Sequence, residues 1–183
     1  MLVNANFVIN KSFAGAAVLS VFTAFWLSTL SKLGNKFAIR HISYKRFFGL
    51  AGFYFMCLHV FFGLRIAKPD ILPQFFFENG DFSVQGQIIF LLGILGFSLF
   101  LFPAISSMKD VMTKLGKKKW LIFQRIGYAA FFVILIHASA VGYQNWLNPN
   151  KWPGMMPPIT LICVIFLLSG LLLRLIVLFK LKK

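Results

Sequence analysis

Residues 87–107, QIIFLLGILGFSLFLFPAISS, contain no charged side chain. A helix of about twenty residues is roughly 30 Å long, which matches the thickness of the hydrocarbon core of a bilayer. No water reaches that core, and a helix satisfies its own backbone hydrogen bonds there. We therefore predict that this segment crosses a membrane as an α-helix, and this prediction decides the class of the fold.

Four further apolar segments flank this one along the chain. They cover approximately residues 13–33, 47–66, 122–142 and 159–179. The 183 residues are 59% hydrophobic and 17% aromatic, which is more than a soluble domain of this size buries. Nothing between the segments is long enough to fold separately. We expect an all-α fold, with residues 1–183 forming one polytopic membrane domain of about five transmembrane helices.

The charged residues are distributed unevenly between the loops. Nineteen Lys and Arg face only four acids, giving a net charge of +15. The basic residues cluster after the first and third spans, whereas three of the four acids follow the second span. By the positive-inside rule, the N-terminus then lies outside and the C-terminus in the cytoplasm. No recognition motif accompanies the charge, so we exclude nucleic acid as a partner and expect membrane lipid around the chain.

Two of the three histidines, His59 and His137, lie inside apolar spans, where an ionisable side chain is costly without a partner. His59 follows Arg46 by thirteen residues, and His137 follows Arg125 by twelve. Helical rise places both imidazoles roughly 18–20 Å from the basic boundary, in the outer half of the bilayer. Two imidazoles at one depth suit the two axial positions of a haem iron. A lone intramembrane histidine also commonly hydrogen-bonds a neighbouring helix, but the matched pair favours one b-type haem.

Small residues and one arginine lie near these histidines. Gly52 and Gly63 share a helical face with His59, and two alanines share one with His137. Such residues either leave room for a flat macrocycle or allow close helix packing. Arg65, near the outer end of the second span, either pairs with a haem propionate or anchors its helix at the interface.

The loop between the second and third spans is too long for a tight turn and contains Pro73 and three consecutive phenylalanines, Phe75–Phe77. It either lies along the interface or covers the outer end of the bundle, or it is an ordinary amphipathic loop. We expect the ordinary loop.

Two stretches of sequence carry a family resemblance: KRFFGL at 45–50, continuing through Phe53-Tyr54 to Leu58-His59, and the run from Ser106-Ser107 through Trp120 and Gln124-Arg125 to His137. In their order and spacing they resemble the ferric reductase-like transmembrane domain family. They most resemble the haem-binding membrane subunit of the bacterial periplasmic methionine sulfoxide reductase system. The resemblance covers about residues 12–180. It implies a multi-pass, haem-binding oxidoreductase subunit of the bacterial inner membrane that delivers electrons to a periplasmic reductase partner or to ferric iron.

Two departures from the family pattern change what it implies. The family subunit usually has six spans, whereas we expect five here. Related two-haem oxidases also place an inner histidine about thirteen residues before each outer one, and Arg46 and Gln124 occupy those positions in this chain. Neither is a usual haem ligand. The resemblance therefore implies that the outer haem site is kept and the inner one is lost.

The position of the lost inner haem is an expected site for a second redox group. Single-haem metalloreductases of the same superfamily use a flavin on the inner side. Arg46, Gln124 and Arg125, with the basic loops, suit the phosphate of FMN or FAD, or a quinone headgroup. The cytoplasmic segments are too short for a nucleotide-binding domain, so a partner reductase or the quinone pool would supply the electrons.

Two other classes of function compete with electron transfer. A structural subunit of a larger membrane complex, without catalytic activity and without haem, also fits the missing span and the missing inner ligands. A channel or transporter is the weaker alternative, because the spans hold no carboxylates for an ion or proton pathway. Fold resemblance alone does not decide between the first two functions, or whether the chain is itself an enzyme.

Overall fold

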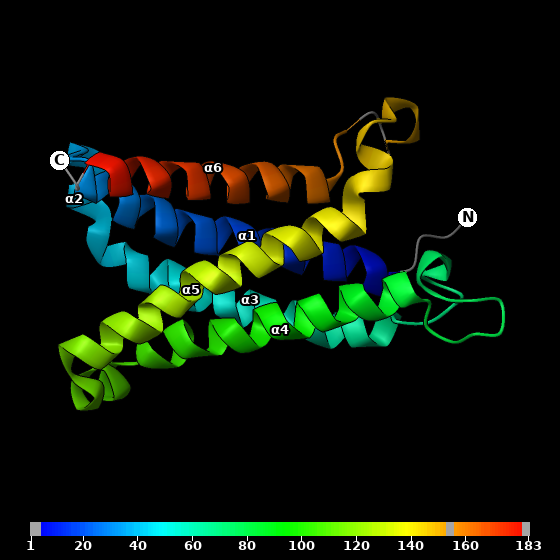
Figure 1. Cartoon of the computed structure of the whole chain (residues 1–183), viewed down its shortest axis with the longest axis horizontal. Coiled ribbons are helices and arrows are strands. Elements are labelled where there is room, and N and C mark those ends of the chain that lie inside the picture. Colours follow the sequence, from blue (N-terminus) through cyan, green and yellow to red (C-terminus); the bar gives the residue numbers. More distant parts are fainter. Residues whose placement is uncertain (1–4, 153–155, 181–183) are drawn as a thin grey trace.

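The computed structural model describes residues 5–152 and 156–180, and it is built from helices within those ranges (Figure 1). A short helix, α2 (Lys36–His41), and a 3₁₀ turn at Ile42–Tyr44 connect the first two long helices. Five helices are long and apolar enough to cross a membrane. They are α1 (Ala5–Lys32), α3 (Lys45–Ile66), α4 (Val84–Ser106), α5 (Lys109–Trp146) and α6 (Ile159–Lys180). The predicted all-α class and the five apolar spans are confirmed.

Two long helices extend beyond the predicted spans. α1 begins at Ala5, eight residues before the predicted start at 13, because this weakly polar segment continues the helix. α5 begins at Lys109 but is interrupted at Gly116, where φ is 70° and ψ is 160°. Only glycine adopts this left-handed region without steric cost. The basic residues before Gly116 therefore form a separate helical segment ahead of the long apolar helix.

The long helices pack as two antiparallel pairs (Figure 1). α1 packs along α3, and α4 packs along α5. α6 contacts both α1 and α5 and so joins the pairs on one side. α3 and α4 touch much less, and α3 and α5 are not among the closely packed pairs of the described helices. The spans predicted to carry the two histidines therefore belong to different pairs.

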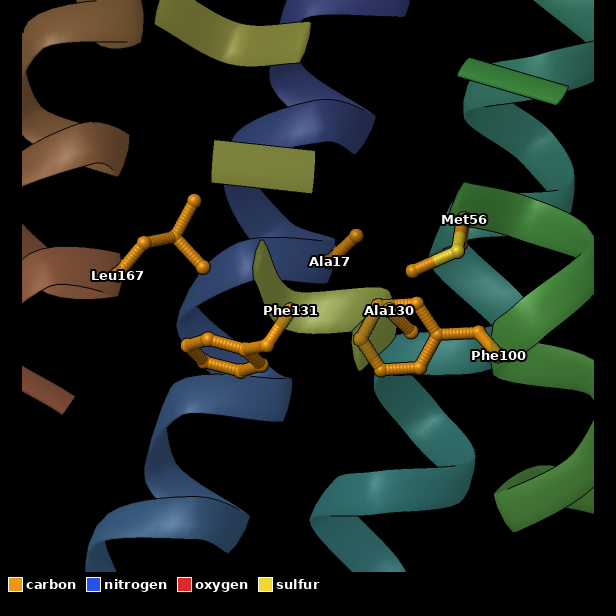
Figure 2. Close-up of a cluster of buried hydrophobic side chains, with 6 residues drawn as sticks. All are labelled: Ala17, Met56, Phe100, Ala130, Phe131 and Leu167. Carbon is orange, nitrogen blue, oxygen red and sulfur yellow. The ribbon is translucent and has the colours of Figure 1, made fainter. Parts of the chain in front are cut away.

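The centre of the bundle is a cluster of apolar side chains drawn from all five long helices (Figure 2). Phe131 is almost fully buried in it, and Met56 and Phe100 approach from α3 and α4. The remaining members are Ala17, Ala130 and Leu167. Other large apolar side chains, such as those of Leu91 and Phe179, are exposed on the outside of the helices. This distribution is expected of a multi-pass protein whose surroundings are lipid.

The two ends of the bundle differ in character (Figure 1). The basic end carries α2 and the end of α6, and the loop end carries the start of α1 and the segment 67–83. In that segment Leu72 and Phe75 are buried against Ile66 and Ile89. The backbone N–H of Ser83 donates to the oxygen of Phe75 at 2.9 Å and fixes the fold of the loop. The expectation of an ordinary amphipathic loop was wrong, because these apolar side chains turn inward and cover the end of the bundle.

Candidate functional site

His59 is fixed by the backbone of the neighbouring helix. Its Nδ1 lies 3.2 Å from the backbone oxygen of Asn10 on α1. A carbonyl oxygen only accepts hydrogen bonds, so Nδ1 carries the proton and donates. The proton on Nδ1 leaves Nε2 with a free lone pair in the neutral ring. His59 is therefore held in the tautomer that presents Nε2 to a metal.

His137 is held in the same way within the other helix pair. Its Nδ1 lies 3.0 Å from the backbone oxygen of Ile89 on α4. Each histidine thus donates to the helix that packs along its own. Within residues 5–152 and 156–180, neither Nε2 has a hydrogen-bond partner. Metal-ligating histidines usually donate their second ring N–H to a backbone carbonyl or a carboxylate, which is the arrangement seen here.

The two imidazoles are both half-buried. They come from α3 and α5, which belong to different pairs, so they approach the interior from separate helices. Two neutral imidazoles, each with its Nε2 lone pair free, form the donor set of a bis-histidine iron porphyrin. The residues present fit that group.

The glycines beside His59 serve helix packing. A Cβ on Gly52 would collide with Val21 and lie 3.2 Å from the backbone oxygen of Ala17, both on α1. A Cβ on Gly63 would lie 3.7 Å from Oδ1 of Asn10, also on α1. Both glycines therefore face α1, and of the two alternatives for these positions the structure supports close packing.

Arg65 lies on the exposed surface of α3. Its guanidinium carbon is 5.7 Å from the ring centroid of Phe61, which is exposed as well. Among the described residues, no hydrogen bond or ion pair joins Arg65 to the surroundings of His59. This placement favours the anchoring role over the pairing with a propionate.

Arg46, Gln124 and Arg125 come together around a cavity of about 400 Å³ at the basic end. Lys32, Lys45 and Arg174 line it as well, and none of the four acids of the chain is among its described lining residues. Aromatic side chains of Phe25, Trp120 and Tyr128 form part of its wall. The residues named for the inner site therefore line a cavity that is cationic and partly aromatic. Neither His59 nor His137 lines it.

Gln124 is fixed at the edge of this cavity. Its Nε2 lies 3.1 Å from the oxygen of Pro103, 3.0 Å from Oγ of Ser106 and 3.1 Å from Oγ of Ser107. Two of these oxygens belong to the last turn of α4, and the third belongs to its C-cap residue, Ser107. The amide thus holds α5 to the end of α4.

Sequence reasoning missed one cation of the cavity, Arg174, whereas Lys45 belongs to a basic loop that was expected there. Nζ of Lys45 donates to Oγ of Ser28 at 3.2 Å and is drawn toward α1. The guanidinium of Arg174 lies 5.0 Å from the ring centroid of Tyr128. Only the three-dimensional packing of α6 against α5 reveals that Arg174 points into the bundle. A basic residue within an apolar span was the only available signal.

Comparison of the chain with protein-family models finds no match, and comparison with curated proteins finds none.

Proposed function

We propose that the protein transfers electrons across a membrane through one b-type haem ligated by His59 and His137. The observation that supports this most is the matched pair of Nδ1 hydrogen bonds, which leaves both Nε2 atoms free for iron. Haem, when bound, supplies a one-electron couple whose potential depends on its axial ligands and surroundings. The family resemblance supports the same reading.

The chain itself contributes orientation and exclusion of water. The carbonyl oxygens of Asn10 and Ile89 set the tautomer and the ring direction of the two histidines. Seen from the two histidines, the central cluster with Met56 lies on the side of the basic end, and the covering loop with Phe75 lies on the other side. A site between these two apolar layers is dry, which favours tight ligation and a defined potential.

The basic cavity is the proposed place where electrons arrive. By the positive-inside rule, the basic end faces the cytoplasm, here that of a bacterial inner membrane. A flavin such as FMN or FAD, or a quinone headgroup, would bind there, with Arg46 and Arg125 suiting an anionic group. Nε1 of Trp120 is buried and has no partner among the described residues, so a donor is available at this wall. A partner reductase or the quinone pool would supply electrons, and a periplasmic reductase or ferric iron would receive them.

The reduced-minus-oxidised absorption spectrum of the purified protein tests the proposal. It should show a low-spin b-type haem that disappears in His59→Ala and in His137→Ala. His41→Ala is the matched control, because Nδ1 of His41 bonds the oxygen of Phe37 in its own short helix. A folded preparation that takes up no haem would instead support the structural-subunit alternative. Loss of haem in His41→Ala would overturn the ligand assignment.

A further inference from the structure

The buried side chain of Asn10 has an amide oxygen without a hydrogen-bond partner among the described residues. The residue is 8% exposed. Buried polar groups are nearly always hydrogen-bonded, because removing them from water without a new partner is unfavourable. In a membrane-spanning helix the surrounding lipid supplies no partner either. The amide oxygen therefore calls for a partner from outside the chain.

The amide lies beside the candidate haem ligand. The backbone oxygen of Asn10 accepts the hydrogen bond from His59, and Oδ1 lies close to Gly63, one turn further along α3. The other two buried polar side chains, Thr29 and Ser106, belong to the opposite region, at the basic end. Asn10 is thus the buried polar side chain at the level of the histidine pair among the described residues.

Comparison of the two helix pairs shows that a backbone carbonyl holds an imidazole without a side-chain amide on the same residue. In the second pair, the carbonyl that holds His137 belongs to Ile89, whose side chain is apolar and packs in the core under the loop. A backbone carbonyl is sufficient to hold the imidazole. The carboxamide at position 10 is an addition to that arrangement, so it has a role other than orienting His59.

We propose that the Asn10 carboxamide hydrogen-bonds a carboxyl group of the cofactor that His59 ligates, which for haem is a propionate. This inference rests on the proposed function. An amide offers N–H donors to a carboxylate, and its oxygen accepts from a protonated carboxyl or a bridging water. Rotation of the amide by half a turn exchanges the two ends, so either form of the propionate is accommodated. Arg65, directed at Phe61 on the exposed surface, leaves this role open.

Two substitutions test the inference on the full-length protein. Asn10→Leu and Asn10→Ala remove the amide but keep the backbone oxygen that holds His59. We expect opposite effects in the two forms of the protein. Without haem, the variants should unfold at a higher temperature than the wild type, because an unpartnered buried amide oxygen is gone. With haem, they should lose it to an apomyoglobin acceptor about tenfold faster, since a hydrogen bond to a charged group is lost.

Ser12→Ala is the matched control, since Ser12 is an exposed α1 residue whose Oγ bonds the oxygen of Val8. It should change neither quantity. The inference would be overturned if both Asn10 variants lost haem at the wild-type rate and their haem-free forms unfolded at a lower temperature than the haem-free wild type. Asn10 would then be a residue of the fold alone. Haem uptake by the wild-type protein is measured separately. Its absence would overturn the proposed function and, with it, this inference.

Discussion

Gly93 of α4 lies directly against the imidazole of His137 on α5, so that a Cβ at position 93 would stand 3.1 Å from Cε1 of the ring. That distance is shorter than side chains normally approach. The carbonyl of Ile89, one turn before Gly93, holds Nδ1 of the same ring. The backbone of α4 therefore positions the imidazole in two ways. The oxygen of Ile89 accepts its hydrogen bond, and Gly93, which has no side chain, leaves room for the ring.

Gly93→Ala should displace the ring of His137 and weaken haem retention about tenfold or more while the protein stays folded. The added methyl group forces the ring to move by a few tenths of an ångström, and axial ligation depends on its direction. Haem content per protein and the sharpness of the reduced absorption band measure the effect. Gly170→Ala is the control, because its Cβ would meet Phe22 and Phe25 at an ordinary 3.5 Å. Equal haem content in both variants would contradict this account of Gly93.

Gly52→Ala should lower the free energy of unfolding by about 1–3 kcal/mol, because the new methyl group overpacks the contact with α1. Gly49→Ala, one turn earlier on α3, meets nothing within 4 Å. It should leave stability unchanged or raise it by up to about 1 kcal/mol through helix propensity. Thermal or denaturant unfolding in detergent compares the two. A smaller loss in Gly52→Ala than in Gly49→Ala would mean that α1 and α3 are less closely packed.

Gln124→Leu should destabilise the protein by about 1–2 kcal/mol, since three oxygens at the end of α4 lose a donor. Unfolding in detergent measures the change. Gln87→Leu is a suitable control, because its amide makes one exposed hydrogen bond to the oxygen of Phe82. We expect its effect to stay within about 0.5 kcal/mol. An unchanged stability of Gln124→Leu would show that the amide does not hold α5 to α4.

Arg174→Gln should weaken FMN binding about tenfold if a flavin phosphate enters the basic cavity, because a charge-assisted contact is lost. Quenching of flavin fluorescence during titration with the purified protein reports the affinity, and added salt should weaken it further. Arg40→Gln removes an exposed charge of α2 that does not line the cavity and should have no effect. A wild type that binds no FMN would leave quinone as the remaining proposal for this cavity.

The helical class and the number of spans could be predicted because they depend on apolar length alone. Residues 87–107 can be assigned to a membrane from their own length and composition, without knowing which helices surround them. The expected depth of His59 and His137 likewise comes from helical rise, applied to their separations in sequence from Arg46 and Arg125. Arg46, Gln124 and Arg125 were named for an inner site through the family resemblance, and they line one cavity. That this cavity holds a flavin or a quinone stays a prediction.

Features that depend on which helices are neighbours could not be predicted. Asn10 sits in a weakly polar segment before the first predicted span, and only its position beside His59 gives it significance. The role of Gly52 depends on Val21 of α1, and that of Arg174 on Tyr128 of α5. The inward turn of Phe75 arises from backbone bonds within the loop, which composition does not encode.

The two-pair arrangement has a consequence for assembly. Each helix pair contains one histidine and the backbone carbonyl that orients it, so each pair fixes the direction of its own imidazole. α6 connects the pairs along one side, whereas α3 and α5 have no close packing of their own. On the proposed function, a bis-histidine cofactor would add a further link between the pairs, beside the α3–α4 contact and the central cluster. Without that link the two pairs are joined more weakly, so the haem-free protein should be cut by proteases faster than the haem-loaded form.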